Sequence, residues 1–556
     1  MRRFLITLLL AGTFLFQFPP SHAQRKNAKG GKTPPVSVAT QRGADVIAAA
    51  QLRDYLSFIA SDEMEGRDTP SRGLDTTAKF LAMNLSRWGF KPAGDAGSYL
   101  QHIALRRDRV DAEQTRVEVN GRALTLGDDY IPSSVPGSAD GQLVFAGNGW
   151  LIKSRNIDAY KDIDARGKIA IIFGSPNSFP RGLSRANLEG KPGEGWLSAA
   201  DYATKAGVAG IVYVPDFQYL ANWNRNRQRT LERGSTVVEK FQTQTAARIP
   251  SITISPDLAN ALFQGEKLGA TTLFERIFSG GDVPDSFLLS ADKKLSINVV
   301  VKNETVGTQN VVAVWEGSDP VLKDEYVALG AHYDHIGVNA IQKGDWIYNG
   351  ADDDGSGTTA LLAMAEALAH ASVRPKRSVL FVWHAGEEKG LWGSRYFTEY
   401  PTIPLDRIVT QLNIDMIGRS KKAGDTNPRN KDLSGPNDIY VIGSKMMSTE
   451  LGTLSETVNK SFLNLNFDYR YDDPGDPNRF FFRSDHFNYA RKGVPIIFYF
   501  DGVHEDYHQP GDSADKIDYT KMEKVARTIY MTMWEIASLP VRPKVDKQLP
   551  PELTRD

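Results

Sequence analysis

The sequence predicts an α/β protein in which a mainly parallel sheet flanked by helices carries an inserted, strand-rich domain. From about Ser296 onward, short apolar runs alternate with helical patterns, as in VVAVWEG, YVALGAH, TTALLAMAEALAHA, SVLFVWHAGEE, IVTQLNIDMIG and VPIIFYF. Such alternation is typical of βαβ units, whose parallel strands are buried on both faces. Between about Arg116 and Leu289 the runs are shorter and separated by Gly, Pro and Asn, which indicates a separate domain of strands.

The N-terminus has the pattern of an export signal. Arg2 and Arg3 precede an apolar run, and Ser21-His22-Ala23 places small residues where a signal peptidase reads them, so residues 1–23 are predicted to be removed after Ala23. An uncleaved anchor is the alternative. No later stretch approaches about 20 apolar residues. We therefore expect an exported protein, periplasmic or extracellular, with no stable membrane insertion after cleavage.

The rest of the chain divides into five further units. Residues 24–43 are basic and contain Gly and Pro, which is typical of a flexible leader. Residues 44–115 hold two amphipathic helical patterns that are expected to pack on a larger body. The strand-rich insert is predicted over residues 116–292, the catalytic domain over 293–540 and a C-terminal tail over 541–556.

Composition narrows the possible partners and metal ligands. The 556 residues exceed one ordinary core, and their formal net charge of -1 gives no reason to propose nucleic acid or an acidic membrane as a partner. The chain has no cysteine. A tight metal site must therefore use His, Asp and Glu. Oligomeric state is left open by the sequence.

Five predicted strand ends and loops carry metal-binding side chains: GAHYDH, NGADDDGSG, HAGEEKG, NIDMIG and YHQPGD. Turns are rich in Asp and Gly in any protein, so one such segment would mean little. In an open α/β sheet, however, ligands bind beyond the carboxyl ends of the strands, which is where these segments fall. Five together predict a single catalytic metal centre.

These segments resemble those of the co-catalytic two-zinc aminopeptidases, relatives of bacterial leucyl aminopeptidase. The same family contains the glutamate carboxypeptidase II ectodomain, the catalytically silent transferrin receptor and the glutaminyl cyclases. The resemblance implies a zinc-peptidase fold of the phosphorylase/hydrolase-like type, two zinc ions per chain and peptide or protein substrates. By position, it makes the metal ligands His332, Asp353, Glu388, Asp415 and His508, with Asp353 bridging both ions.

The resemblance also implies roles for the neighbours of the ligands. Glu387 becomes the general base, and Tyr507 donates a hydrogen bond to the oxyanion. Asp334 is expected to orient a metal-binding imidazole. The peptide bond after the bridging aspartate is expected to be cis, with Asp354 shaping the loop rather than binding metal. Asp485 is the expected polar contact with the substrate. The insert resembles a protease-associated domain, which borders the active-site cleft in relatives.

The chemistry of these residue types agrees with the implied roles. Two divalent ions about 3.5 to 4 Å apart need a shared anionic ligand, which Asp353 can supply. Imidazole and carboxylate donors can hold each ion and still leave a position for water. Glu387 can take a proton from that water and pass it to the leaving amine. Cobalt and manganese accept the same donors, so zinc rests on the family resemblance.

Other interpretations of these segments are weaker. An EF-hand loop would place Ala363 or Ala365 where the bidentate Glu must stand. His504 could be mistaken for the last ligand, but the Tyr-His pair favours His508. The histidines expected in core or surface roles are His335, His370 and His384. The run from Arg225 to Arg233 is interpreted as a solvated loop face.

The predicted function is hydrolysis of N-terminal peptide bonds by a secreted or periplasmic metallo-aminopeptidase. A carboxypeptidase or dipeptidase of the glutamate carboxypeptidase II type is the alternative, and it would need cationic residues that bind a substrate carboxylate. A more remote alternative is a receptor-like binding protein without catalysis. The side chain preferred at the cleaved bond does not follow from the sequence.

Overall fold

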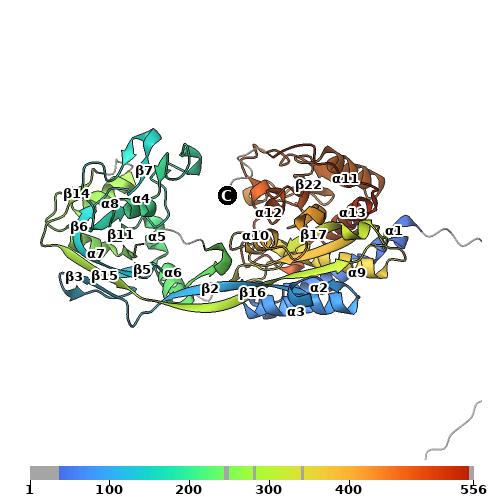
Figure 1. The fold of residues 1–556 in the computed structure, drawn as a ribbon, viewed down its shortest axis with the longest axis horizontal. Coiled ribbons are helices and arrows are strands. Elements are labelled where there is room, and N and C mark those ends of the chain that lie inside the picture. The colour runs from blue at the N-terminus through green and yellow to red at the C-terminus, as the bar shows by residue number, and fades with distance from the viewer. Residues whose placement is uncertain (1–36, 243–248, 280–283, 340–343, 550–556) are drawn as a thin grey trace, which may run out of the picture.

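The computed structural model describes residues 37–242, 249–279, 284–339 and 344–549. The predicted signal peptide and its cleavage site lie outside the described residues. In the last part of the predicted leader, Val38–Gln41 forms the one-turn helix α1, which Ser37 caps. Two bodies are joined by the long antiparallel strands β2 (Leu100–Val110) and β16 (Val301–Trp315), which run along one side of both (Figure 1).

The larger body contains a ten-stranded mixed sheet. Its centre consists of four parallel strands, in the order β20 (Ser378–His384), β17 (Tyr326–His332), β21 (Ile408–Ile414) and β24 (Ile496–Phe500). Antiparallel pairings flank this centre, through β16, β2, β12 (Ser235–Val238) and β1 (Lys91–Pro92) on one side and β22 (Asp438–Ile442) with β23 (Asn466–Asp468) beyond it on the other. The predicted α/β class is confirmed, but the sheet is parallel only at its centre and at the β22–β23 pair.

Helices cover both faces of the central strands. Val327 and Leu329 of β17 pack into the same core as four helices, α2 (Ala49–Ile59), α3 (Arg72–Arg87), α9 (Gly357–His370) and α13 (Tyr519–Ser538). Ala328, between them, faces the opposite core with α10 (Trp392–Glu399) and α12 (His486–Ala490). Because successive side chains of a strand point to opposite faces, each central strand must be apolar throughout.

The amphipathic pattern of the N-terminal segment forms helices, as its spacing predicts. In α3 the residues Leu74, Ala78, Leu81 and Leu85 are buried, at intervals of three and four that place them on one face. The side chain of Ser71 accepts a hydrogen bond from the Leu74 N–H and caps the helix. This face packs against the catalytic sheet.

The smaller body is built mainly on a nine-stranded sheet. Its strands are β3 (Arg116–Val119), β4 (Arg122–Ala123), β5 (Tyr130–Pro132), β6 (Gly137–Phe145), β9 (Ile169–Phe173), β11 (Gly210–Val214), β13 (Ser251–Ile254), β14 (Phe287–Leu288) and β15 (Lys294–Val299). Helix α4 (Ala199–Lys205) packs into one hydrophobic core of this body, and α7 (Pro256–Phe263) packs into the other. Helix α8 (Ala270–Ser279) follows α7. A small separate sheet consists of β7 (Leu151–Ile152), β8 (Ile157–Asp158) and β10 (Trp196–Leu197).

Two features correct the predicted domain bounds. Strand β15 pairs with β3 and β6, so it belongs to the inserted sheet, and the insert ends near residue 300 rather than at 292. Strand β12 lies within the predicted insert but pairs with β2 and extends the catalytic sheet. The local pattern of apolar residues could not predict that β12 rejoins the catalytic sheet, because this depends on its pairing with the distant strand β2.

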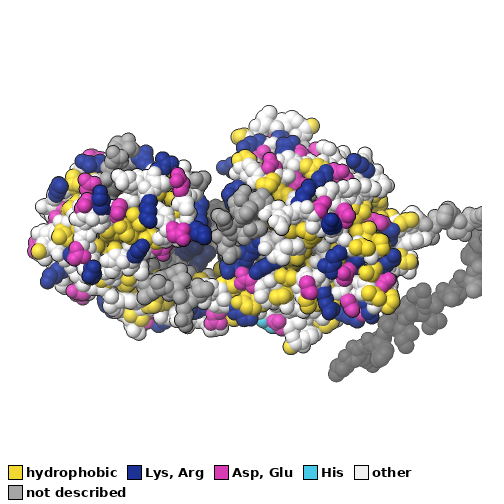
Figure 2. All heavy atoms as spheres, turned by 45° about the horizontal axis from the view of Figure 1, so that its top comes forward, with side chains coloured by type: hydrophobic (Ala, Val, Ile, Leu, Met, Phe, Trp, Pro, Cys, Tyr) yellow, Lys and Arg dark blue, Asp and Glu magenta, His cyan; other side chains and the backbone are white. Residues whose placement is uncertain are grey.

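The surface shows no single dominant charge. Figure 2 shows basic and acidic side chains interspersed over both bodies on the face that it presents. Among the described residues, no helix combines the length and the apolar composition that a bilayer span requires.

Candidate metal centre

The predicted ligands come from segments that meet at the carboxyl edge of the parallel strands. His332 is the last residue of β17, and Asp415 directly follows β21. Glu388 lies in the turn after β20, and His508 in the loop after β24. Asp353 belongs to η9 (Ala351–Ser356), which leads into α9. Because the strands run parallel, their ends share one edge of the sheet, and side chains distant in sequence come together there.

The donor atoms form two groups that share one carboxylate. In the first, His332 Nε2 lies 3.3 Å from Asp353 Oδ1 and 3.5 Å from Asp415 Oδ1. In the second, His508 Nε2 lies 3.1 Å from Asp353 Oδ2 and 3.2 Å from Glu388 Oε2. Donors around a tetrahedral zinc ion, each about 2.0 to 2.1 Å from the metal, are separated by about 3.3 Å. Both groups fit a divalent cation, and Asp353 presents a different oxygen to each.

The same groups contain buried polar atoms without hydrogen-bond partners among the described residues. They include His332 Nε2, Asp353 Oδ2 and Glu388 Oε1. Leaving a buried donor or acceptor unpaired costs about 1 to 3 kcal/mol, so such atoms are rare in folded proteins and rarely gather in one place. A bound cation would satisfy them, and this is an independent sign that the residues present fit metal ions.

The two adjacent glutamates differ in their electrostatics. Burial raises the pKa of Glu387 well above its usual range; His332 opposes this effect, while Glu388 and Asp415 reinforce it. For Glu388, burial and Asp353 also act to raise the pKa, but the neighbouring imidazoles of His335 and His508 outweigh them and lower it to about 2. Carboxylates whose environments separate their pKa values are suited to different roles, here proton transfer and metal binding.

Asp334 and Asp354 both lie outside the donor groups and hold the loops that carry them. Asp334 Oδ1 accepts a hydrogen bond from the Glu387 N–H at 3.1 Å. Its carbonyl oxygen, at 3.2 Å, is closer to His332 Nδ1 than its carboxylate, at 3.7 Å. Asp354 follows a cis peptide bond and accepts hydrogen bonds from the Gly357 and Met416 N–H groups. It therefore ties η9 to the end of β21.

Tyr507 lies over the second donor group. Its ring stacks on His508 with centroids 3.9 Å apart, and its hydroxyl accepts a hydrogen bond from Arg483 at 3.2 Å. Burial raises the pKa of the Tyr507 hydroxyl, and the nearby Asp353 raises it further. The hydroxyl therefore keeps its proton at neutral pH and can donate it in a hydrogen bond.

Asp485 is buried more deeply than the sequence indicated. Its side chain is fully buried, and Oδ2 lies 3.4 Å from His384 Nδ1. The carboxylate therefore offers no exposed atom to a substrate, and the direct substrate contact stays a prediction. His384 in turn lies 3.0 Å from the Tyr489 hydroxyl, in the core role expected for it.

His335 is closer to the site than the sequence indicated. It is fully buried, and its Nδ1 lies 2.8 Å from Glu388 Oε1 and 3.8 Å from Asp353 Oδ2. Neither of the two atoms at 2.8 Å has a hydrogen-bond partner among the described residues, and His335, Asp353 and Glu388 together could also hold a cation. Only its position three residues after His332 could have suggested this. His504 instead lies 3.3 Å from Asp352 Oδ2 and takes no part in either donor group.

Arg67 is a residue of the site that sequence analysis missed entirely. It is fully buried and donates hydrogen bonds to four carbonyl oxygens, those of Ile59, Tyr333, Asn349 and Gly350, at 2.7 to 2.9 Å. These carbonyls belong to the end of α2, to the residue that follows His332 and to the loop that precedes Asp353. A single guanidinium thus joins the N-terminal helices to both ligand loops.

A central parallel sheet with imidazoles and carboxylates gathered beyond its strand ends is the architecture of a metal-dependent α/β hydrolase. Residues 310–533 match the family model described as Peptidase family M28. The matched stretch runs from within β16 to within α13 and includes all five candidate metal ligands.

Known proteins resemble the chain over different extents. Leucine aminopeptidase 2 of Arthroderma otae is 26% identical over 291 residues, 47% of this chain and 52% of that protein. Leupeptin-inactivating enzyme 1 of Streptomyces exfoliatus is 25% identical over 256 residues, 42% of this chain and 50% of that protein. The chain thus spans about half the length of these curated relatives. The solved aminopeptidase from Aneurinibacillus sp. strain AM-1 shares the fold, with 15% identity, coverage of 91% of this chain and 98% of that one, and a TM-score of 0.52.

Proposed function

We propose that this protein is an exported, zinc-dependent metallopeptidase that releases N-terminal residues from peptides. The observation that carries the proposal is the shared carboxylate: Asp353 lies within 3.3 Å of an imidazole on each side, through a different oxygen each time. Such an arrangement suits a pair of cations about 3.5 to 4 Å apart. A single structural zinc site does not require a carboxylate that is shared between two groups of donors.

In this proposal His332 and Asp415 would hold one zinc ion, Glu388 and His508 would hold the other, and both would share Asp353. When bound, the ions would supply Lewis acidity and lower the pKa of water towards neutrality. Metal-binding carboxylates and imidazoles must give up their protons, so binding is expected to weaken as the pH falls.

The remaining steps belong to side chains of the chain itself. Glu387 takes a proton from the attacking water and delivers it to the amine that leaves. Its raised pKa suits both halves of this exchange, because the protonated form is a usable acid near neutral pH. Tyr507 donates a hydrogen bond to the oxyanion of the tetrahedral intermediate, and Arg483 keeps its hydroxyl in place.

Export and the role of the smaller body are also part of the proposal. Support for export is the signal-like pattern of residues 1–23. Support for a protease-associated role of the insert is its position: residues of the insert line a cleft that Glu388 also lines. The insert would then control which peptides reach the metal centre.

The test uses the purified full chain, a panel of aminoacyl-nitroanilides and matched peptides with free or acetylated N-termini. We expect release of free N-terminal residues, and we expect a chelator to abolish it and added zinc to restore it. Cleavage of the acetylated peptides alone would overturn the aminopeptidase assignment in favour of a carboxypeptidase or endopeptidase. Absence of all cleavage by zinc-loaded protein would favour a binding protein on the same scaffold.

A further inference from the structure

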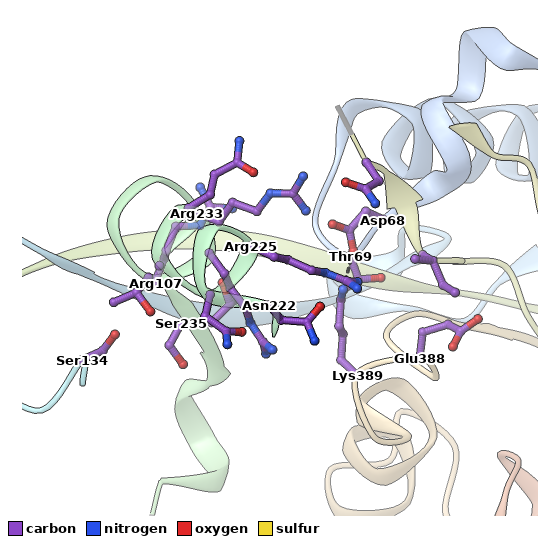
Figure 3. A pocket seen from close by; sticks show the side chains of 18 of the residues that line it. Asp68, Thr69, Arg107, Ser134, Asn222, Arg225, Arg233, Ser235, Glu388 and Lys389 are labelled. Carbon is purple, nitrogen blue, oxygen red and sulfur yellow. Dashed lines mark ion pairs between the residues drawn. The ribbon is translucent and has the colours of Figure 1, made fainter. Parts of the chain in front are cut away.

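A large cleft separates the two bodies and reaches the metal centre. Its volume is about 1330 Å³, and its lining includes Glu388 and Lys389 from the catalytic body. The opposite side is lined by α6 (Trp223–Gln228), by the π-helix η6 (Arg229–Arg233) and by β2. Figure 3 shows Arg225, Arg233 and Arg107 on this side, across from Glu388 and Lys389.

The side opposite the metal centre is rich in arginine. Five arginines line the cleft there and are named the arginine wall: Arg107, Arg109, Arg225, Arg229 and Arg233. Within the described parts of the chain, Arg107 pairs with Glu304 at 3.6 Å, while the other four form no ion pair. Arg233 donates a hydrogen bond to the Val338 carbonyl oxygen.

The acidic side chains that line the same cleft are already engaged. Asp68 pairs with Lys389 at 2.6 Å, and Glu65 lies 3.6 Å from Arg72. Asp216 accepts a hydrogen bond from a backbone N–H and caps α5 (Phe217–Ala221). Glu388 belongs to the metal centre. The arginine wall therefore faces the cleft with excess positive charge.

Local structure explains why these arginines share one side. Arg225, Arg229 and Arg233 recur at intervals of four along continuous helical turns, which places them on one face. Arg107 and Arg109 alternate along β2 and so also share a face. Arg227 lies between Arg225 and Arg229 in the sequence, but it pairs with Asp128 at 3.2 Å and does not line the cleft. The interpretation of this run as a solvated loop face is thus corrected.

We propose that the arginine wall binds carboxylates of the substrate on the leaving-group side, so that the enzyme prefers acidic peptides. This inference rests on the proposed aminopeptidase function, because it requires the N-terminal residue to lie at the metal centre. The chain beyond the cleaved bond must then extend into the cleft, towards the insert. Guanidinium groups bind carboxylates in a bidentate manner and attract them over distances of several ångströms.

Two kinds of carboxylate could occupy the wall: acidic side chains and the C-terminus of a short peptide. The experiment separates them with four peptides that begin Leu-Ala and continue with either Glu-Glu or Gln-Gln, each prepared as the free acid and as the amide. The value of kcat/KM is measured for each at low ionic strength. We expect the Glu-Glu amide to be cleaved faster than the Gln-Gln amide, and the difference to shrink as salt is added.

The variants ask whether the arginine wall causes this preference. An exposed ion pair contributes enough for about a twofold to fivefold effect, so the triple variant Arg225→Gln, Arg229→Gln, Arg233→Gln should lose a preference on the order of tenfold. The single variant Arg225→Gln should lose part of it. Arg227→Gln is the matched control, from the same helix but outside the cleft, and should keep the wild-type ratio.

The outcomes distinguish failure of the proposed aminopeptidase function from failure of the inference about the arginine wall. If leucine p-nitroanilide and all four peptides resist the zinc-loaded enzyme, the proposed function fails and this inference falls with it. If leucine p-nitroanilide is cleaved but all four peptides react equally, only the inference fails. Loss of the preference in Arg227→Gln as readily as in the triple variant would also overturn it. A difference seen only between free acids and amides assigns the wall to the C-terminal carboxylate.

Discussion

Replacing Arg67 with methionine should destabilise the ligand loops, although Arg67 touches none of the ligands. Its guanidinium donates four hydrogen bonds to carbonyl oxygens, and each bond from a charged donor contributes about 1.5 to 3 kcal/mol. Burial lowers the pKa of Arg67 to about 10, although nearby carboxylates such as Asp334 and Asp512 oppose the shift. The net shift corresponds to a cost of roughly 3 kcal/mol for keeping the charge, which methionine would not incur. The net loss of stability for Arg67→Met is therefore roughly 3 to 9 kcal/mol.

Two measurements on the same samples test this estimate. Thermal unfolding should shift down by at least about 6 °C, since each kcal/mol corresponds to about 2 to 4 °C for a domain of this size. Metal content after dialysis should also fall, because the carbonyls of Tyr333 and Gly350 lose the group that holds both ligand loops. Arg67→Lys keeps the charge but not the planar fork, so it should restore little of the loss.

Arg72→Met provides the control. Arg72 begins α3, five residues further along the chain, but its side chain is 82% exposed and lies 3.6 Å from Glu65. Its replacement should change stability by less than about 0.5 kcal/mol. The reasoning is refuted if Arg67→Met unfolds at the wild-type temperature and retains its metal. Equal destabilisation by Arg72→Met would also refute it, by showing that any arginine in this segment matters.

Three further predictions concern single residues. Glu387→Gln should keep both metals, measured by elemental analysis, yet lose about 10²- to 10⁴-fold in kcat; metal loss would mean that base and ligand are misassigned. His335→Ala should lower the occupancy of one metal by loosening Glu388, whereas full occupancy under chelator competition would contradict the 2.8 Å contact. Burial lowers the pKa of His486 to about 3, below its unfolded value, so its contribution to stability is present above about pH 6.5 and is lost as the pH falls towards 3. His486→Phe should therefore flatten the acid side of a plot of unfolding temperature against pH, and an unchanged slope would contradict this.

Part of the candidate ligand set was accessible from sequence, because His332 ends β17 and Asp415 directly follows β21. His332 closes the buried run YVALGAH, and Asp415 follows the buried run of β21, so two boundaries between apolar and polar sequence mark two ligands. The end of a strand can be predicted from the residues immediately around it. The parallel order of the strands then brings those ends together without further information.

The supporting residues were not accessible, because their roles depend on what lies opposite them. Nothing near Arg67 in sequence reveals that four carbonyls from three segments converge on it. Asp485 is a charged residue just before α12, yet its side chain points inward to His384. His335 could not be separated from an ordinary core histidine until its distance to Glu388 was known.

Asp512 shows how far the bridging ligand depends on a remote segment. Its carboxylate accepts hydrogen bonds from the Asp352 and Asp353 N–H groups at 3.0 to 3.1 Å. Burial raises the pKa of Asp512 to about 6, which His504 partly opposes, so it can still ionise at neutral pH. Asp512 lies only four residues after His508. The segment that contains His508 therefore also fixes the backbone of Asp353, and the two donor groups keep their spacing because one loop holds both.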